Sequence, residues 1–403
     1  MSEYDALVVG AGPAGATAAL MLARAGWSVA VVEKAVFPRR KVCGEFISAT
    51  SLPLFEELGI ANDFLAHAGP PVREVGLYAG NTRLAAAMPR FPHGGERYGR
   101  ALCRERFDAA LLRAAANAGA VIWQPWTVKR LSQGANGLHA ASVYGEDRRQ
   151  ATTLRARVVI AAHGSWEGGD LPTHIAACPS RGSDLFAFKA HFVHAALPVS
   201  LMPLMLFPGG YGGMVTTDGG RVTLSCCIRR DTLTACRLQW PHLKAGEAVL
   251  AHIRAANSGV DAVLKPATLE GRWLSVGPIR PGMRSVYSNR IFVVGNAAGE
   301  AHPIVAEGIS MAIQSSWLLC ASLIAHSHEL ELDGAMDKVA RAYSADWRRN
   351  FAARIHAAAL FANLATRPTA AKIAVSLLRR VPQLLTLGAH LGGKAQPPVL
   401  SGS

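Results

Sequence analysis

The chain has 403 residues, 50% of them hydrophobic, which is enough for a substantial core in one large domain or in two or three ordinary ones. It has no run of 18 or more purely apolar residues, no room for a signal peptide before its first strand, and seven dispersed cysteines, so we expect a cytoplasmic protein with reduced thiols, no membrane-spanning helix and no metal site. The formal net charge of +14 has no recognised nucleic-acid-binding motif beside it, which argues against nucleic acid as a partner.

The first predicted elements are a strand, a glycine-rich turn, a helix and a second strand. Residues 4–9 form an apolar strand sequence, residues 10–15 have Gly-x-Gly-x-x-Gly spacing, and residues 29–32 are again apolar. The second strand ends at Glu33, about 20 residues beyond the turn, where a carboxylate can accept a hydrogen bond from a ribose 2′-hydroxyl. This order predicts a βαβ unit that binds a dinucleotide, with Lys34 as a further candidate for contact with it.

Each position of the turn has its own physical role. Gly10 allows the tight bend, Gly12 lets the backbone approach a pyrophosphate, and Gly15 lets the helix pack closely on the strand. Pro13 and Ala14 begin the helix, whose unpaired N–H groups and dipole attract an anion. We therefore predict that the pyrophosphate of a dinucleotide lies on this turn.

The next segment alternates between loop, helix and strands. A loop over residues 38–45 precedes a helix from about residue 107 to residue 118, in which apolar residues recur at helical spacing. Strands are expected at residues 126–131, 138–144 and 154–162. The last of these is nearly all apolar, as in a strand buried on both faces of a sheet.

From about Arg181 to Trp273 the pattern changes to short strands separated by glycine-containing turns, which is typical of an antiparallel sheet. The chain then returns to a buried strand at residues 291–294, a second phosphate-type turn at 295–299 and a long helix from about 307 to 325. We interpret the middle segment as a substrate domain inserted into the nucleotide-binding domain. Its expected strands are residues 186–188, 191–193, 204–207, 214–216 and 222–228.

These elements predict an α/β fold with a Rossmann-like domain, an inserted antiparallel β-sheet domain and a C-terminal helical region. The expected boundaries are residues 1–75, 96–178 and 277–330 for the discontinuous nucleotide-binding domain, 76–95 and 179–276 for the substrate-binding sheet, and 331–403 for the helical region.

The C-terminal region combines positive charge with an apolar helical face. From residue 347 onward it holds eight Lys and Arg residues and no Asp or Glu. Pro382 should kink or split the helix that carries the apolar face. Core packing is the first interpretation of that face, and peripheral contact with a membrane surface is the second. The face consists of Ile373, Leu377, Val381 and Leu385.

Three separated segments match one flavoprotein pattern. They are the turn at 10–15 with Glu33, an Arg-x-x-Phe-Asp-x-x-Leu segment at 104–111, and Gly-Asn-Ala-Ala at 295–298 followed by Pro303 and Gly308. Together they resemble the FAD-dependent monooxygenase and geranylgeranyl reductase superfamily, which has the para-hydroxybenzoate-hydroxylase-like fold. The resemblance spans nearly the whole chain and implies that the Rossmann-like domain is an FAD-binding domain.

The resemblance also implies individual contacts with FAD. Arg104 would lie near the flavin pyrophosphate or ribityl chain, and the backbone of Val128 would contact adenine. N–H groups near Gly308 and Ile309 could stabilise the anionic N1–C2=O edge of reduced flavin. Beside the ribityl chain and the isoalloxazine ring would lie Gly295, Asn296 and Pro303.

Two positions depart from the pattern of this superfamily. Asn296 stands where an aspartate is usual; its amide can still bond a ribityl hydroxyl but carries no charge. The usual Asp-Gly after the buried strand is here His163 and Gly164. Gly164 keeps its expected place beside the cofactor, whereas the docking of a nicotinamide donor is put in doubt. His163 is either a catalytic acid or base or a structural hydrogen-bonding residue.

The loop at residues 41–45 resembles the Lys-x-Cys-Gly loop of the reductase and halogenase-like branch, which lies over the flavin. The resemblance implies cofactor contacts for Lys41 and Cys43. Cys43 then either lines the redox site or only forms the turn with the glycine that follows it. Glu45 is the nearest carboxylate that could transfer a proton.

Residues 207–213 resemble a reductase segment, Tyr/Phe-Pro…Gly-Tyr-x-Trp, that lies over the substrate cavity. The expected tryptophan is absent, and Gly213 and Met214 stand there instead, which should open the cavity. The chain also lacks the Trp-x-Trp-x-Ile-Pro segment and an assignable lysine of tryptophan-type halogenases, which argues against halogenation.

The favoured hypothesis is an FAD-dependent monooxygenase that hydroxylates a hydrophobic, aromatic or polyketide-like small molecule of secondary metabolism. NAD(P)H would reduce noncovalently bound FAD, and oxygen would reach the substrate through a flavin C4a-hydroperoxide. The first alternative is a reductase of isoprenoid double bonds, favoured by the loop at Cys43 and the basic C-terminal helices. The second is a flavin-binding or lipid-surface protein without turnover, suggested by His163 and Asn296 in place of acids.

Overall fold

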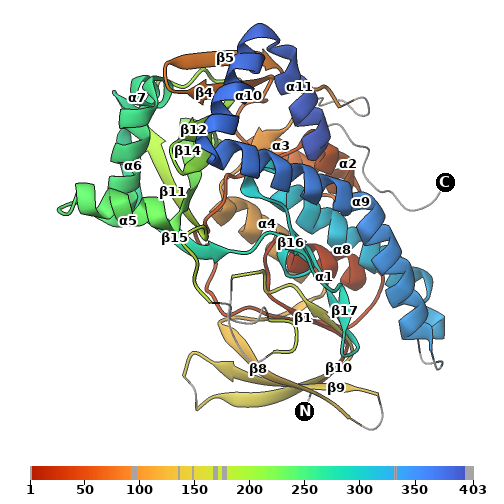
Figure 1. Ribbon diagram of the computed structural model, residues 1–403. Coiled ribbons are helices and arrows are strands. Elements are labelled where there is room, and N and C mark those ends of the chain that lie inside the picture. The colour runs from red at the N-terminus through yellow and green to blue at the C-terminus, as the bar shows by residue number, and fades with distance from the viewer. Residues whose placement is uncertain are drawn as a thin grey trace.

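The computed structural model describes residues 2–91, 98–134, 137–147, 149–166, 171–174, 179–330, 332 and 334–394. Within these residues the chain forms one sheet of eight strands and one of seven, with helices packed on both (Figure 1). The predicted α/β class, with a Rossmann-like domain, a second sheet and a helical C-terminal region, is confirmed. Two further strand pairs are β3 (Phe46–Ile47) with β6 (Arg100–Ala101), and β16 (Gly282–Met283) with β19 (Gly299–Glu300).

The eight-stranded sheet has the order β17–β18–β10–β1–β2–β7, and β9 extends it from β10 with β8 paired to β9. Strands β18, β10, β1, β2 and β7 run parallel to one another. β1, β2 and β10 carry runs of buried apolar residues, as expected for strands covered on both faces. The strands are β1 (Ser2–Val9), β2 (Val29–Val32), β7 (Val121–Trp123), β8 (Trp126–Gln133), β9 (His139–Gly145), β10 (Ala151–Ala161), β17 (Tyr287–Ser288) and β18 (Ile291–Val293).

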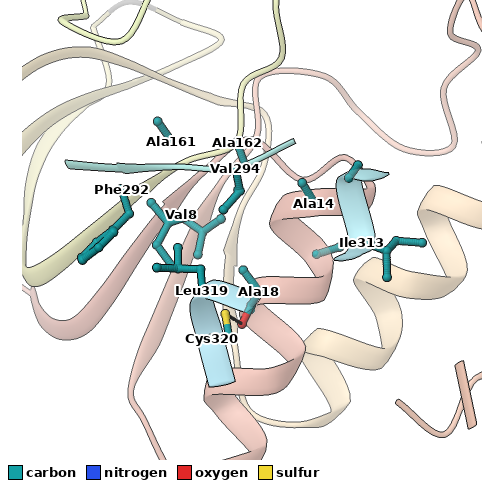
Figure 2. Close-up of a cluster of buried hydrophobic side chains, with 14 of the residues drawn as sticks. Val8, Ala14, Ala18, Ala161, Ala162, Phe292, Val294, Ile313, Leu319 and Cys320 are labelled. Carbon is teal, nitrogen blue, oxygen red and sulfur yellow. Dashed lines mark hydrogen bonds between the residues drawn. The ribbon is translucent and has the colours of Figure 1, made fainter. Parts of the chain in front are cut away.

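Helices α1 (Pro13–Arg24) and α8 (Gly308–Ala325) pack against each other over this sheet (Figure 2). The small side chains of Ala14 and Ala18 let α8 come close, and Ser316 Oγ donates a hydrogen bond to the Ala14 carbonyl at 2.8 Å. α8 has the length and hydropathy of a membrane span, yet 67% of that span is buried inside the protein. It packs on α1 and on the long helix α9 (Ala335–Thr366), so we interpret it as a core helix.

Helices α2 (Leu52–Glu57), α3 (Ala61–His67) and α4 (Arg104–Asn117) pack together through aromatic rings. α4 packs on α1 and begins three residues before the predicted start at residue 107. The ring centroids of Phe55 and Phe64 are 5.0 Å apart, and those of Phe55 and Phe107 are 5.7 Å apart. Short 3-10 turns are η1 (Ala49–Ser51), η2 (Asp218–Gly220), η3 (Gly295–Ala297), η4 (Pro303–Val305) and η5 (Ser327–Glu329).

The seven-stranded sheet has the order β15–β11–β14–β13–β12–β4–β5. Its strand pairs are antiparallel except for the parallel pair of β4 and β12. β4 and β5, which come from the first hundred residues, form one edge of this sheet, and its other strands come from residues 185–279. Helices α5 (Arg230–Gln239), α6 (Ala245–Ala256) and α7 (Ser258–Leu264) cover one face of it. The strands are β4 (Glu74–Ala79), β5 (Thr82–Ala87), β11 (Leu185–Val193), β12 (Leu201–Phe207), β13 (Gly210–Thr216), β14 (Val222–Arg229) and β15 (Thr268–Ile279).

The C-terminal helices α10 (Pro368–Arg380) and α11 (Gln383–Ala389) lie over the β4–β5 edge of this sheet (Figure 1). A short π-helical turn, η6 (His390–Lys394), follows α11. Pro382 separates the two helices, which confirms the predicted break. Core packing of the predicted apolar face is wrong for Ile373, Leu377 and Val381, which are exposed, and holds only for Leu385, which is buried.

The six cysteines in the described part of the chain are free thiols, and Cys178 lies outside it. The predicted long helix from about 307 to 325 matches α8, and the predicted strands after residue 126 match β8 to β10 within a few residues. The domain boundaries given above remain predictions.

Replacing Gly15 with alanine should destabilise the fold. A Cβ at Gly15 would lie 1.8 Å from the carbonyl oxygen of Gly10, so α1 could not stay on its strand. Overpacking of this kind costs about 1–3 kcal/mol or more in the free energy of unfolding. Denaturant unfolding of Gly15→Ala would measure it. The control is Gly388→Ala in α11, where no atom lies within 4 Å and alanine should stabilise the helix by about 0.5–1 kcal/mol. Equal stabilities would contradict the packing described here.

Candidate functional site

A cavity of about 1130 Å³ lies between the two large sheets and the C-terminal helices. Typical small-molecule pockets measure roughly 300–1,000 Å³, so this cavity can hold a dinucleotide together with a second molecule. Every predicted site residue except Gly15 lines it; Gly15 is packed beneath Gly10. The lining thus includes Gly10, Gly12, Pro13, Ala14, Glu33, Lys34, Lys41, Cys43, Glu45, Arg104, Val128, His163, Gly164, Gly295, Asn296, Pro303, Gly308 and Ile309.

The first turn is shaped so that backbone faces the cavity. Gly10 has φ +102°, and a Cβ there would lie 2.7 Å from the Ala162 carbonyl oxygen. A Cβ at Gly12 would meet nothing nearer than Arg104 Nη2 at 3.9 Å and Arg39 Nη2 at 4.0 Å. Gly12 therefore borders an open space between two guanidinium groups at the start of α1, where amide N–H groups lack intrahelical acceptors.

Arg104 and Arg39 have different roles in this space. Arg104 is held rigidly, since its Nε and Nη2 donate to the two carboxylate oxygens of Asp108 at 2.6 and 2.7 Å. Burial alone would lower the pKa of Arg104, but the charge and hydrogen bonds of Asp108 raise it, so the group stays cationic. Arg39 is partly buried, and its Nε and Nη1 atoms, which are shielded from solvent, have no hydrogen-bond partner among the described residues.

The carboxylates nearest Arg39 do not satisfy it. Glu33 lies 3.7 Å from Arg39 Nη2, and Asp108 lies 3.6 Å from Nη1, beyond hydrogen-bond distance. A buried guanidinium with unsatisfied donors is costly unless an anion completes it. Sequence reasoning did not assign Arg39, although the basic run at residues 39–41 is visible in the loop.

Glu33 contacts the turn directly. Its Oε2 accepts a hydrogen bond from the Ala11 amide at 2.8 Å, and its Oε1 accepts one from the Ala35 amide at 2.9 Å. A carboxylate has about four lone-pair sites, so two more donors can still be accommodated. The side chain is buried and also lines the cavity, as a contact with a ribose hydroxyl would require.

The second turn meets the first. Gly295 has φ +62°, and a Cβ there would lie 2.9 Å from the Cβ of Ala14 on α1. Its amide donates to Ser315 Oγ on α8 at 3.2 Å, and the backbone carbonyl of Asn296 accepts a hydrogen bond from Arg284 at 2.8 Å. Two helix starts, those of α1 and α8, thus open onto one cavity from segments almost 300 residues apart.

His163 lies in the cavity wall with both ring nitrogens occupied. Nδ1 is 2.8 Å from the Gly164 carbonyl, and Nε2 is 2.8 Å from Thr173 Oγ1. Its ring also packs edge-on against His174, with centroids 4.5 Å apart. These contacts hold the ring in place, so of the two interpretations of His163 the structure favours the structural hydrogen-bonding residue.

Glu45 is held by four donors in a fully enclosed network. Oε1 accepts from the Arg104 amide at 2.9 Å and from Lys189 Nζ, and Oε2 accepts from Thr223 Oγ1 at 2.6 Å and from His191 Nε2 at 2.8 Å. Burial alone would raise the pKa of Glu45, but its hydrogen bond to His191 and the charges of Lys189 and His191 lower it to about 2.

This environment does not suit proton transfer at neutral pH, because a carboxylate with so low a pKa stays ionised. Glu45 also has φ +64°, a conformation that costs a non-glycine residue about 1–2 kcal/mol and that the four donors maintain. We therefore interpret Glu45 as a structural residue and not as an acid or base. Its hydrogen bonds connect the loop at residues 41–45 to the seven-stranded sheet. Cys43 Sγ accepts a hydrogen bond from the Glu45 amide at 3.3 Å, so the thiol helps to form this turn while lining the cavity.

Sequence reasoning missed three polar residues that line the cavity between the second turn and the second sheet: Tyr211, Glu300 and His302. Ser165 Oγ donates to Glu300 Oε2 at 2.6 Å, and the Tyr211 hydroxyl lies 3.3 Å from His302 Nδ1. Burial raises the pKa of Glu300 and lowers that of His302 to about 4. Titratable pairs shifted in this way are candidates for acid and base chemistry.

The signals for these residues were present but weak. Glu300 and His302 lie between the Gly-Asn-Ala-Ala turn at 295–298 and Pro303. The superfamily pattern specifies no residue type at these two positions. Tyr211 lies in the Gly-Tyr segment that was assigned to the substrate cavity. Only the register of β13 against β14 shows which way Tyr211 faces.

The far part of the cavity is apolar. A Cβ at Gly213 would meet only the Pro203 carbonyl, at 3.4 Å, so the missing tryptophan leaves space there. Side chains of β4, β12 and β13 form one wall, and the end of α9 with α10 and α11 forms the other. Among them are Val75, Leu77, Met202, Leu204, Leu206, Met214, Phe361, Leu364, Leu377, Leu378, Leu384 and Leu385.

The last described residue of the chain is bonded to the second loop. Lys394 Nζ donates to the carbonyls of Val305 and Ala306 at 2.8 and 3.1 Å and to Glu307 Oε1 at 2.6 Å. Glu307 is buried and also lies 3.8 Å from Arg354. The C-terminal helices are therefore attached to the loop that precedes α8.

Glu45→Gln should destabilise the fold by about 3–5 kcal/mol at pH 7, because it leaves buried Lys189 without its counter-charge. Since the folded pKa of about 2 lies below the ordinary 4.5, this stabilisation is complete above pH 4.5 and is lost as the pH falls toward 2. Denaturant unfolding at several pH values should show the two proteins converging there. Glu329→Gln, at an exposed ion pair of 3.4 Å, should change stability by about 1 kcal/mol or less. A pH-independent difference would contradict this account.

Three characterised proteins illustrate the similarity of this chain to known proteins over most of its length. Conditioned medium factor receptor 1 of Dictyostelium discoideum is 25% identical over 354 residues, 82% of this chain and 65% of that protein. Tryptophan 2-halogenase of Chondromyces crocatus is 24% identical over 375 residues, 86% of this chain and 66% of that protein. Digeranylgeranylglycerophospholipid reductase 2 of Methanopyrus kandleri is 26% identical over 371 residues, 87% and 83% of the two chains. This chain thus spans less than two thirds of the first two.

Solved structures share the fold. The myxobacterial chondrochloren halogenase CndH superposes with a TM-score of 0.77 at 18% identity, covering 100% of this chain and 93% of that one. P. aeruginosa PqsL in complex with 2-aminobenzoylacetate gives a TM-score of 0.72 at 17% identity, covering 92% and 98%.

The family described as FAD binding domain matches residues 3–357, which is most of the chain. This agrees with the two turns that meet at one cavity and with the fold of the solved flavoenzymes, and it confirms the superfamily to which the sequence was compared. The chain therefore belongs to the FAD binding domain family.

Proposed function

We propose that this protein is an FAD-dependent oxidoreductase that acts on a hydrophobic small molecule bound in the apolar part of the cavity, beside FAD. The observation that carries the proposal is the continuity of one cavity from the Gly12 turn to the apolar wall of β4, β12 and α10. Apolar walls bury most of a ligand's surface and exclude water from a reacting centre.

The residues present fit FAD. The pyrophosphate would lie over Gly12, where it would complete the unsatisfied donors of Arg39 and meet the amides that begin α1. Glu33 would accept the ribose hydroxyl, and Val128 would border adenine. At the other end the amides that begin α8, at Gly308 and Ile309, would face the flavin ring.

We further propose monooxygenation, with NAD(P)H as the electron donor. Bound FAD would supply the redox chemistry, accepting hydride from the nicotinamide and activating oxygen for transfer to the substrate. The chain's own part would be to bind and orient the substrate, to exclude water, and to hold protons at His302, Tyr211 and Glu300. The fold shared with PqsL, crystallised with 2-aminobenzoylacetate, supports an aromatic substrate class only by analogy.

The second candidate is reduction of isoprenoid double bonds. The loop at Lys41 and Cys43, which lines the cavity, favours it, and a digeranylgeranylglycerophospholipid reductase is among the relatives. One assay separates the candidates: purified holoprotein with NAD(P)H and panels of aromatic and polyprenyl compounds, with and without oxygen. Oxygen consumption that rises with substrate supports the monooxygenase, and product formed without oxygen supports the reductase. Protein that keeps FAD and never oxidises NAD(P)H with any compound would contradict both.

Gly12→Val should abolish retention of FAD. The added side chain would fill the space between Arg39 and Arg104, with a loss of affinity of about 100-fold or more if two hydrogen bonds to the anion are lost. The flavin absorbance of the purified protein and titration of the apoprotein with FAD would measure it. The matched control is Gly213→Val in the apolar part of the same cavity, which should keep FAD. A yellow Gly12→Val protein would contradict the placement of the pyrophosphate.

His302→Gln should keep FAD and slow turnover by about 10²–10⁴-fold, the usual contribution of a positioned acid or base. Tyr211→Phe, which removes the hydroxyl 3.3 Å from His302, should alter the acidic limb of the pH–rate profile, where His302 with its pKa near 4 becomes protonated. Rates would be measured with the compound that the oxygen assay selects. His163→Gln is the comparison; a larger effect there than at His302 would contradict the assignment.

A further inference from the structure

Exposed aliphatic side chains gather at the C-terminal helices. Among the described residues fourteen large hydrophobic side chains are exposed, and seven of them lie between residues 360 and 391. Their exposed fractions range from 38% to 66%. A concentration of this kind marks an interaction surface, whereas single exposed hydrophobic residues do not. The seven are Leu360, Leu364, Ile373, Leu377, Val381, Leu387 and Leu391.

On α10 the aliphatic residues form a stripe. Ile373 and Leu377 lie four residues apart, so they share one face of α10, and exposed Val381 follows directly after the helix ends. No residue of α10 is fully buried. Lys372, Arg379 and Arg380 are exposed on the adjoining part of the same helix. An apolar stripe beside a cationic one is the pattern of a helix that lies in the interface of a membrane.

The charge of this surface indicates what covers it. From residue 347 onward the sequence contains no Asp or Glu, so no acidic residue of this segment neutralises Lys372, Arg379 and Arg380. Anionic lipid headgroups attract such cations, while aliphatic side chains enter the boundary of the acyl chains. A second copy of this chain, which carries the same positive charge, would meet the surface with electrostatic repulsion.

The same side chains border the cavity. Leu364 and Leu377 are exposed, at 38% and 52%, and also line the cavity. Leu378 and Leu384 continue the lining inward toward the apolar wall. The mouth of the substrate space thus opens among the side chains that would enter the lipid.

We propose that α10, α11 and the end of α9 dock on an anionic membrane surface, and that an apolar substrate enters the cavity from the lipid through the mouth at Leu364 and Leu377. The entry of substrate rests on the proposed function; the docking itself does not. The partner is a lipid surface with anionic headgroups, and the substrate is a molecule that partitions into the acyl region.

The test is flotation of the FAD-loaded full chain with vesicles of phosphatidylcholine alone or of equal amounts of phosphatidylcholine and phosphatidylglycerol. We expect binding to the mixed vesicles at low salt, weaker binding as salt rises, and little binding to phosphatidylcholine. Arg379→Gln with Arg380→Gln should weaken binding about fivefold per cation. Ile373→Ser with Leu377→Ser should weaken it by removing the apolar contact.

The control variants carry the same kinds of substitution on the exposed helix α5. Leu238 on α5 is 78% exposed and Arg237 beside it is also exposed, so Leu238→Ser and Arg237→Gln should leave vesicle binding unchanged. Flavin absorbance of each variant reports that the fold is intact. Hydrogen exchange with and without vesicles should show protection confined to α9–α11, which distinguishes these helices from residues 395–403.

Binding that ignores phosphatidylglycerol, or that the control substitutions reduce equally, would overturn the proposal. So would a concentration-dependent dimer without vesicles that Ile373→Ser with Leu377→Ser converts to monomer, because the surface would then join two copies. No substrate is needed, so failure here leaves the oxygen assay and the proposed reaction standing on their own result.

Discussion

The close contact between α1 and α8 is the constraint on which the rest of the site depends. Ala14 and Ala18 on α1 are small enough for α8 to approach (Figure 2). Ser316 Oγ on α8 donates a hydrogen bond to the Ala14 carbonyl. At the top of this contact a Cβ on Gly295 would be 2.9 Å from the Ala14 Cβ. Larger residues here would separate the two helix starts, and no single anion-binding cavity would form.

A second constraint joins the loop at residues 41–45 to the seven-stranded sheet. Glu45 belongs to the loop, whereas Lys189 and His191 belong to β11 and Thr223 to β14, and all four side chains meet away from solvent. A buried ionic network of this kind contributes little net stability after desolvation, yet it fixes a geometry that apolar packing leaves adjustable. The seven-stranded sheet, which forms a wall of the apolar space, is thereby held at a fixed place relative to the loop at residues 41–45, which lines the same cavity.

The sequence predicts those features of the fold and the site that depend on residues close together in the chain. The turn at residues 10–15 and Glu33 follow from local spacing, and Arg104 follows from the resemblance to the superfamily. The residues named from them line the cavity apart from Gly15. The side-chain partners of Glu45 could not be predicted, because they lie more than 140 residues away and are brought together by the pairing of β11 with β14. His163 likewise owes its fixed ring to Thr173, and the exposure of Ile373 depends on which edge α10 meets.

The attachment of Lys394 limits how the helices over the cavity can move. The segment formed by α10 and α11 is fixed at both ends. At one end it continues from α9, and at the other Lys394 donates hydrogen bonds to the Val305 carbonyl and to Glu307. Swinging this segment away would leave the Glu307 carboxylate in a low dielectric without its nearest cation, which is a large penalty. A ligand therefore passes more cheaply by rotamer changes of the aliphatic side chains beneath the segment than by lifting it. The distance between these two fixed ends then limits the width of a ligand that can enter the cavity.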